Sequence, residues 1–571
     1  MSTKNVSFGI DLGTTNSCIS MMRAGTSVPK VIPLRNGNTL PSCVMLNRDG
    51  TFTVGIDAYN KRFEKSTIYS VKRYMGSDKI IHLESGSCCK DLTPEEVSAE
   101  ILKELVIEAS EYVGCDIIKD VTITVPAHFN DAQRRATQTA GRLAGLNVIG
   151  IINEPTSAGL LYGIDNAKSN QTIIVYDLGG GTFDVSILKV TKELKSFPML
   201  GINTNGEYNK TAINIIANDG DVHLGGDDID KNLADYAVEQ IAKSTNLTTD
   251  TVMSIMGEVG YEELQLRIEK AKKNGRGVIL YKLKGCEEVQ VKLSGDDVNE
   301  KCYKPVFDKS YELMTQAMAQ AGITHIDHIV LVGGSTKSSV IQKMIMEKFP
   351  HINVMNSFEP DLSVALGASI SSASTLGINT LATITDVVPM SIGVVVFERD
   401  EDNVIRERFD RILKKDTQLP CSDNREYDIL NAHSSDMTIR IMQGDGTYNF
   451  NNLIEIGKLH IGKDDYVGNK AEILFKCDLN GVLSCAVIIE GKEFNIPINY
   501  TANDSKIVED DGIEMLDKGQ RFFYQSHKKK LEKMGASVLQ LERFTPGLVQ
   551  TSISIAKEIF DDIVEELKNN K

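Results

Sequence analysis

Three short apolar runs in the chain each end in a glycine turn. Residues 173–182 read IIVYDLGGGT, an unbroken apolar run followed by Asp-Leu and three glycines. Residues 8–17 read FGIDLGTTNS on the same plan, and residues 329–336 read IVLVGGST. Apolar runs of this length that stop at a turn signal are typical of buried strands. The pattern therefore predicts three buried strands whose ends carry glycine turns.

The glycine turns indicate close approach to an anion. Gly179, Gly180 and Gly181 have no side chains, so their N–H groups could converge on phosphate oxygens. Asp177 could hold Mg²⁺ through water, and the Thr182 hydroxyl could add a donor. An ordinary glycine-rich turn explains this one segment equally well.

Recurrence of the motif favours a phosphate site. Two of the three turns carry Asp-Leu-Gly, which predicts a duplicated ATPase core with phosphates between its halves. Neither GxxxxGK[ST] nor GxGxxG occurs in the sequence, so the P-loop and Rossmann explanations lose their main support.

Two charged residues beside predicted element boundaries could take part in phosphate chemistry. Glu154 stands between an apolar strand end and a helix that starts at Pro155. Its carboxylate could orient an attacking water, or could simply interact with the helix dipole. Lys72 could stabilise charge that develops on a γ-phosphate, although the residues alone favour a solvated lysine.

In the last third of the chain the spacing of apolar residues changes. Residues 387–500 contain short alternating runs, one of which turns at Asn480-Gly481, and this predicts hairpins of an antiparallel sheet. From residue 505 the apolar spacing becomes helical, with Ile555, Ile559 and Ile563 four residues apart.

Composition excludes several classes of protein. A chain of 571 residues exceeds one usual core of about 250–300 residues, so two or three domains are expected. The net charge of −16 argues against nucleic acid and anionic membrane as partners. The start of the chain lacks an apolar signal region, which predicts a cytoplasmic protein. Ten scattered cysteines without a CxxC pair indicate reduced thiols rather than a zinc site.

Taken in order, eight stretches resemble one family, the seventy-kilodalton heat-shock chaperones of the DnaK type. They are residues 9–17, 72–76, 125–146, 153–163, 177–184, 223–230, 269–272 and 332–336. Weaker similarity continues through most of the remainder. The resemblance implies a multidomain α/β plus β plus α protein. Its expected parts are an actin-like two-lobed ATPase domain over 1–379, a linker over 380–386, a β-sandwich peptide-binding domain over 387–504 and a short α-helical lid over 505–571.

The resemblance also implies roles for residues of the ATP site. The catalytic set would be Lys72, Glu154, Asp177, Thr182 and Asp11, with Asp11 and Asp177 holding Mg²⁺ through water. K⁺ is a further cation that the resemblance allows. The implied nucleotide-binding residues are Gly13, Thr14, Thr15, Asn16, Gly179, Gly180, Gly181, Gly225, Gly226, Glu269, Lys272, Lys273, Arg276, Gly333, Gly334, Ser335, Lys337 and Asp361.

Two further sets of residues follow from the resemblance. Pro126, Arg134 and Asp386 would relay the nucleotide state to the linker. The implied peptide groove consists of Val394, Phe397, Tyr427, Leu430, Met437 and Ile439. For Val394 and Ile439, ordinary sandwich core is nearly as good an explanation.

Several positions depart from the family pattern. Lys337 stands where arginine is common, which predicts weaker nucleotide binding because planar stacking on adenine is lost. His128 stands where the relay usually has tyrosine. The linker carries Ala382, Thr383 and Thr385 in place of leucines, so its apolar docking is in doubt. The short tail and residues 386–393 look closest to the bacterial HscC branch.

The implied function is that of an ATP-dependent chaperone. It would bind exposed hydrophobic segments of unfolded proteins and change its affinity for them through ATP binding and hydrolysis. A J-domain co-chaperone and a nucleotide exchange factor are the implied partners. The rival hypotheses are a nucleotide-gated holdase or exchange partner with little turnover, and a small-molecule kinase of the actin superfamily.

Overall fold

The structure is a computed structural model of the chain. It describes residues 6–26, 28–114, 118–165, 170–198, 205–356, 359–378, 382–399, 405–429, 436–444, 453–496, 498, 527–531, 534, 557, 560–561 and 563–564. The chain forms two compact units. The first comprises Met1–Met75, Lys79–Phe129 and Gln133–Asp386, and the second comprises Gly76–Asp78, Asn130–Ala132 and Val387–Lys571.

The first unit contains two six-stranded sheets. One has the order β11-β10-β1-β2-β3, with β4 paired to β2. Its strands are β1 (Val6–Asp11), β2 (Asn16–Arg23), β3 (Lys30–Val31), β4 (Leu40–Pro41), β10 (Asp120–Val125) and β11 (Asn147–Asn153). The other has the order β18-β17-β12-β13-β14-β19. Its strands are β12 (Gln171–Leu178), β13 (Phe183–Pro198), β14 (Asn205–Asp221), β17 (His328–Val332), β18 (Asn353–Asn356) and β19 (Ala382–Thr385).

The two sheets repeat one plan, as the sequence pattern predicts. In each, an antiparallel pair is joined by an Asp-Leu-Gly turn, with Asp11 opposite Cys18 in the first sheet and Asp177 opposite Asp184 in the second. A parallel strand flanks each pair, β10 beside β1 and β17 beside β12. The three predicted strands, β1, β12 and β17, are confirmed.

Helix α10 (Ser363–Thr375) packs on the first sheet, helix α4 (Glu154–Asp165) packs mainly on the second, and the two helices contact each other. A Cβ on Gly367 would lie only 1.8 Å from the carbonyl oxygen of Ser157, so glycine allows α10 to approach α4. On the first sheet α2 (Pro94–Val113) and α3 (Asp131–Leu143) also contribute to a core that includes Phe8, Ile10 and Leu102.

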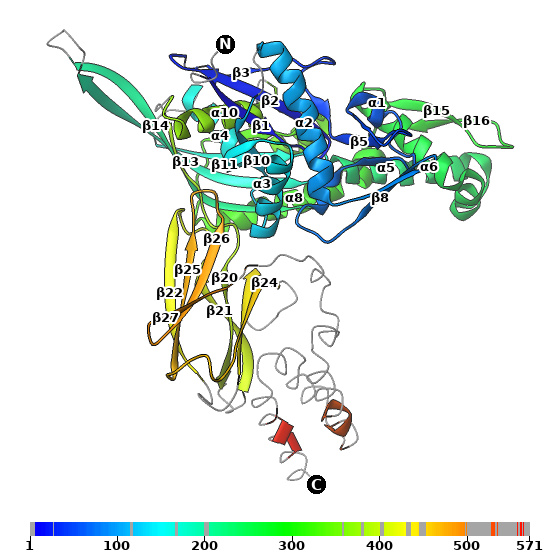
Figure 1. The fold of residues 1–571 in the computed structure, drawn as a ribbon. Helices are drawn as coiled ribbons and strands as arrows, with labels where there is room; N and C mark the ends of the chain where they lie inside the picture. Colours follow the sequence, from blue (N-terminus) through cyan, green and yellow to red (C-terminus); the bar gives the residue numbers. More distant parts are fainter. Residues whose placement is uncertain are drawn as a thin grey trace. The chain divides into compact units, whose positions relative to one another are not determined.

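Smaller elements complete the first unit (Figure 1). Those that precede β10 are β5 (Cys43–Leu46), β6 (Phe52–Val54), α1 (Ile56–Tyr59), β7 (Thr67–Tyr69), η2 (Val71–Tyr74), β8 (Ile81–Ser85) and β9 (Cys88–Leu92). Those that follow β14 are α5 (Gly226–Thr245), α6 (Thr249–Lys273), β15 (Val278–Lys282), β16 (Glu288–Lys292), α7 (Asp296–Val298), η3 (Asn299–Tyr303), α8 (Lys304–Gln320), η4 (Gly334–Lys337) and α9 (Ser339–Lys348).

The second unit contains two four-stranded antiparallel sheets. Their orders are β21-β20-β23-β24 and β22-β25-β26-β27. The strands are β20 (Ile392–Arg399), β21 (Ile405–Leu413), β22 (Cys421–Asp428), β23 (Met437–Gly444), β24 (Leu453–Ile461), β25 (Lys470–Cys477), β26 (Leu483–Ile489) and β27 (Lys492–Asn495). Side chains of both sheets share one apolar core, which includes Ile441 and Phe475. The predicted hairpin at Asn480-Gly481 is confirmed as the β25–β26 connection, where Gly481 has a φ of 73°.

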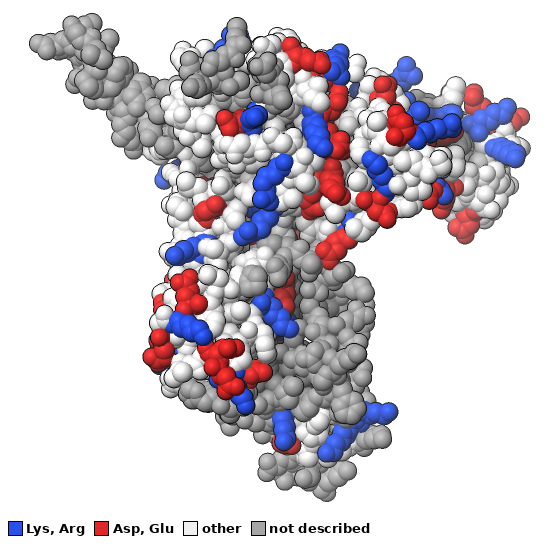
Figure 2. All heavy atoms as spheres, viewed as in Figure 1, with Lys and Arg blue, Asp and Glu red and all other residues white. Residues whose placement is uncertain are grey.

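The helical tail predicted from residue 505 lies largely outside the described residues. Residues 527–531 are helical, and Leu531, Phe560 and Ile563 are buried. No helix in the described part of the chain is long and apolar enough to cross a membrane. Acidic and basic side chains are mixed on the face drawn in Figure 2.

Candidate nucleotide site

A cavity of about 760 Å³ in the first unit brings the glycine turns together. Its size is typical of sites for small molecules and cofactors. The expected site residues that line it are Asp11, Gly13, Thr14, Thr15, Asn16, Lys72, Glu154, Asp177, Gly179, Gly180, Thr182, Gly226, Glu269, Lys272, Lys273, Arg276, Gly333, Gly334, Ser335, Lys337 and Asp361. Gly181 and Gly225 belong to the same loops but do not line the cavity.

One end of the cavity holds a buried ion pair between Lys72 and Glu154. The Lys72 ammonium contacts the Glu154 carboxylate, and both residues are less than a tenth exposed. Glu154 is the first residue of α4, directly after β11, and Lys72 lies on η2. The solvated position that the sequence alone favours for Lys72 is therefore wrong.

Carboxylates outnumber cations around this ion pair. Burial, followed by the charge of Glu154, raises the pKa of Asp11 to about 7 and the pKa of Asp177 well above its usual value. The same two causes raise the pKa of Asp184 to about 8, although its carboxylate accepts a hydrogen bond from the His128 N–H at 3.2 Å. The cluster therefore favours an added cation.

The donor chemistry of this cluster fits Mg²⁺, which prefers oxygen ligands and usually keeps several waters. Asp11 and Asp177 both line the cavity. No group of three or more acidic, histidine or cysteine side chains among the described residues forms a ready metal site. Asp11 and Asp177 would therefore hold the ion through water and phosphate oxygens rather than as a complete protein cage.

The raised pKa values predict how the stability of the nucleotide-free protein depends on pH. Folding raises the pKa of Asp184 to about 8, so the folded state binds a proton that the unfolded state lacks above about pH 4. This stabilisation is complete at low pH and is lost as pH rises through 8, with a slope of about 1.4 kcal/mol per pH unit for each proton. Thermal unfolding should therefore show a higher midpoint at pH 6 than at pH 8.5. Asp184→Asn should reduce that difference, and an unchanged difference would contradict the prediction.

The glycine turn after β12 departs in one respect from the expectation of three free amides. The Gly179 N–H donates to the Thr182 carbonyl oxygen at 3.0 Å and closes the turn on itself. The expectation is therefore wrong for Gly179. The third turn meets this one closely, because a Cβ on Gly333 would lie 2.5 Å from Asp177 Oδ1. Only glycine fits there, which explains why a glycine, Gly333, directly follows β17.

Three of the basic side chains expected around the nucleoside, those of Lys272, Lys273 and Lys337, are paired with carboxylates. Lys272 lies 2.6 Å from Asp230, and the Lys337 ammonium contacts the Asp361 carboxylate. Asp230 also lines the cavity; it ends the family-like stretch 223–230 but is not among the expected site residues. Other lining residues that the sequence reasoning missed are Asp227, Ile229, Gly275, Gly277, Leu293, Ser294, Asn299, Tyr303, Ser338, Ser339, Val340, Pro360 and Val364.

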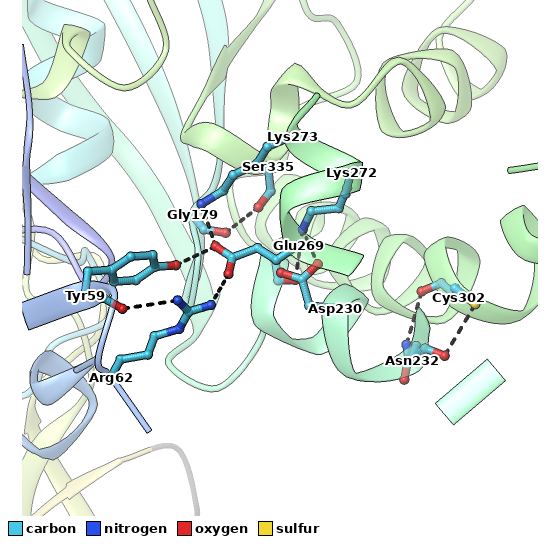
Figure 3. A network of polar contacts seen from close by, with 11 residues as sticks. Tyr59, Arg62, Gly179, Asp230, Asn232, Glu269, Lys272, Lys273, Cys302 and Ser335 are labelled. Carbon is cyan, nitrogen blue, oxygen red and sulfur yellow. Dashed lines mark hydrogen bonds and ion pairs between the residues drawn. The ribbon is translucent and has the colours of Figure 1, made fainter. Parts of the chain in front are cut away.

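Glu269 joins two segments that are far apart in sequence (Figure 3). Its carboxylate accepts a hydrogen bond from the Tyr59 hydroxyl at 2.5 Å. It also forms an ion pair with Arg62 Nη2 at 2.5 Å. The Arg62 guanidinium also lies over the Tyr59 ring, 4.1 Å from its centroid. Burial alone would raise the pKa of Glu269, but Lys273, Tyr59 and Arg62 together lower it. Glu269 lines the cavity, so these contacts form a latch beside it.

Breaking the latch should speed nucleotide release. In Arg62→Ala, the rate constant for ADP dissociation is expected to rise about tenfold, since a hydrogen bond to a charged group contributes roughly 1.5–3 kcal/mol. Stopped-flow release of a fluorescent ADP analogue measures it. Arg48→Ala removes an exposed arginine from the same half of the unit and should leave the rate unchanged. An unchanged rate in Arg62→Ala would show that the latch does not limit release.

Residues 382–385 of the linker form a β-strand, β19, rather than docking through apolar side chains. β19 pairs in parallel with β14, from Thr211 opposite Ala382 to Asn214 opposite Thr385. Backbone hydrogen bonds hold such a strand whatever its side chains are, so the reduced apolar area of the linker does not prevent this contact.

The expected relay residues Arg134 and Asp386 meet through a residue that the sequence reasoning missed. The Asn153 amide donates to both Asp386 oxygens, at 2.9 and 2.8 Å, and its oxygen accepts from Arg134 Nη2 at 2.6 Å. Pro126 follows β10, and a loop carbonyl beyond it, that of Phe129, accepts from Arg134 Nε at 3.2 Å. Asn153 is the last residue of β11, next to Glu154, so this chain of hydrogen bonds begins one residue from the cavity.

Two of the expected groove residues lie in the core of the second unit, and two others pack against that core. Val394 and Ile439 are buried in the shared core of the two sheets, and Tyr427 and Met437 pack against it. Phe397 is half-buried, and Leu430 lies outside the described residues. The Tyr427 hydroxyl donates to Asp410 Oδ2 at 2.7 Å. The sandwich-core explanation of Val394 and Ile439 thus stays open.

Comparison with known proteins identifies the family. The sequence profile of the Hsp70 protein family matches residues 7–551. The chain is 30% identical over 594 residues to "Chaperone protein DnaK" of Mycoplasmopsis agalactiae, an alignment that covers all of this chain and 92% of that protein. Because the match spans nearly the whole chain, the protein belongs to the Hsp70 family of ATP-hydrolysing, ATP-dependent chaperones.

Proposed function

We propose that the cavity between the glycine turns binds Mg²⁺–ATP, and that hydrolysis there controls how tightly the second unit holds hydrophobic peptide segments. The observation that carries this proposal is the buried Lys72–Glu154 pair, which shares one cavity with Asp11, Asp177 and Thr182. The arrangement combines a cation, a carboxylate that can orient water, and two further carboxylates suited to a hydrated metal ion.

Hydrolysis of ATP depends mainly on the positions of the attacking water and the γ-phosphate. A water attacks the γ-phosphorus, the bond to the β–γ bridging oxygen breaks, and ADP and inorganic phosphate leave. Glu154 would orient the water, and Lys72 and Thr182 would stabilise the charge on the γ-phosphate oxygens. Mg²⁺ would neutralise the β- and γ-phosphate oxygens. No protein nucleophile is required.

Control of peptide affinity requires that ATP bind two conformations unequally. A coupling free energy of about 1–3 kcal/mol is typical of such systems. The β14–β19 pairing and the chain from Arg134 through Asn153 to Asp386 are the contacts that would differ between the two conformations.

Other aspects of the function stay predictions. They are the roles of K⁺, a J-domain co-chaperone and a nucleotide exchange factor, a helical lid, a cytoplasmic location and membership of the HscC branch.

Release of a labelled hydrophobic peptide tests the proposal. ATP is expected to accelerate release from the full-length protein at least about tenfold, and Thr182→Ala should reduce that acceleration because hydroxyl and charge contacts to the γ-phosphate distinguish ATP from ADP. Fluorescence anisotropy of the peptide measures release. A release rate that does not change when ATP is added would support the holdase hypothesis. Transfer of the γ-phosphate to a polyol, without production of free phosphate, would support the kinase hypothesis.

A further inference from the structure

The carbonyl oxygens of the glycine turn after β12 are all hydrogen-bonded. Gly179 O accepts from the Gly226 N–H at 3.0 Å and from the Ser335 hydroxyl at 2.8 Å. Gly180 O accepts from the Asp227 N–H at 2.7 Å. These donors come from the start of α5 and from η4, whose neighbours Leu224, Ile229 and Ile341 belong to the core of the second sheet.

The third carbonyl is held from the other half of the unit. Gly181 O accepts from Arg73 Nη2 at 3.1 Å, and the same nitrogen lies 3.3 Å from Asp227 Oδ2. Arg73 lies on η2, whose residue Val71 belongs to the core of the first sheet. The contact is close, because a Cβ on Gly181 would lie 2.6 Å from Arg73 Nε.

Each tethered carbonyl determines the direction of the next amide. A trans peptide is planar, so its N–H points opposite to its C=O. The bond from Arg73 to Gly181 O therefore turns the Thr182 N–H away from Arg73. Thr182 lines the cavity, so its N–H is a candidate donor to a ligand there.

Without Arg73 this one peptide group would lose its tether. Glycine tolerates a wide range of backbone angles, so the peptide between Gly181 and Thr182 could rotate at little cost. The two preceding peptides would keep their donors, all of which belong to the half that carries the turn. Only the Thr182 amide depends on a donor from the opposite half.

We propose that Arg73 is a positioning residue for ATP hydrolysis, which holds the Gly181–Thr182 peptide so that the Thr182 N–H faces the γ-phosphate when the two halves of the first unit are closed. This inference rests on the proposed role of the cavity as an ATP site. Opening of the halves withdraws Arg73 and releases the peptide, so closure and orientation of the donor are one event.

Single-turnover hydrolysis by the full-length protein, together with dissociation constants for ATP and ADP, tests the inference. Arg73→Ala should lower the hydrolysis rate constant about tenfold to a hundredfold, since an oriented donor to a developing charge contributes at least that much. Affinity for ADP, which lacks a γ-phosphate, should change by less than about threefold. Arg73→Lys keeps the charge but not the fork of donors, so it should recover only part of the rate.

Arg142→Ala is the matched control, because Arg142 is exposed on α3 and, within the described part of the chain, its side chain donates to Thr139 of its own helix. Its hydrolysis rate should equal that of the wild type. A wild-type rate in Arg73→Ala would overturn this inference alone. Equal losses of ATP and ADP affinity with unchanged hydrolysis of bound ATP would overturn it too, because Arg73 would then only stabilise closure. A wild-type protein without hydrolysis would overturn both this inference and the proposed site.

Discussion

Glu154→Gln is expected to lower the single-turnover rate of ATP hydrolysis about a hundredfold or more, as loss of a general base or water-orienting carboxylate usually does. Glutamine keeps the size of the side chain at the start of α4 but removes the charge that pairs with Lys72. Lys72 still lines the cavity, so ATP should still bind. Rapid-quench measurement of phosphate release, with ATP binding measured in parallel, separates the two effects.

Glu108→Gln provides the matched control for this prediction. Glu108 is equally buried, on α2, and its carboxylate accepts from the Arg35 N–H at 2.8 Å, but it does not line the cavity. Hydrolysis in this variant should match the wild type. If Glu154→Gln hydrolysed ATP as fast as the control, Glu154 would have only the role of a helix-entry charge.

Asp386→Ala is expected to uncouple ATP from peptide release. The carboxylate accepts two hydrogen bonds from the Asn153 amide and one from the Thr156 hydroxyl at 3.3 Å, which tie the end of the linker to the first turn of α4. Without it, the strand pairing of β19 remains but loses its anchor beside Glu154. ATP-stimulated peptide release should fall at least about tenfold, which corresponds to a loss of about 1.4 kcal/mol of coupling.

Basal hydrolysis distinguishes uncoupling from damage to the site. In Asp386→Ala the single-turnover rate without peptide should stay within about threefold of the wild type, because no residue of the cavity changes. Asp297→Ala, which removes a carboxylate from the start of α7, should affect neither quantity. Peptide release that still accelerates with ATP in Asp386→Ala would rule out this anchor as the route of coupling.

Local sequence pattern was enough to predict the elements that build the cavity. The apolar runs of β1, β12 and β17, the start of α4 at Glu154 and the β25–β26 turn at Asn480-Gly481 all depend on neighbours within a few residues. Buried strands and tight turns have such local signatures because apolar period and glycine content decide them. The resemblance of ordered motifs then indicated the family, which the match over residues 7–551 confirms.

Contacts between distant segments had no such signature. No local pattern marks Tyr59 and Arg62, which reach Glu269 only when the segment around α1 packs beside α6. Asn153 gains its bridging position only when Arg134, 19 residues before it, and Asp386, 233 residues after it, both pack against it. Tertiary packing decides which partner a polar side chain meets. Neither the residue type nor its spacing from other residues in the sequence therefore reveals its hydrogen-bond partner.

The sequence by itself determined the strands, the glycine turns and the family of this protein, because those depend on local period and on ordered motifs. Only the tertiary structure decided which hydrogen-bonding and charged groups are already paired within the protein and which can contact a ligand. It engages the Gly179 N–H within its own turn, pairs Lys72 with Glu154, and adds residues 382–385 of the linker to β14 through their backbone although the linker has less apolar area than the family pattern. Each outcome depends on which hydrogen-bonding groups meet in the folded chain, and that is decided by the packing of segments far apart in sequence.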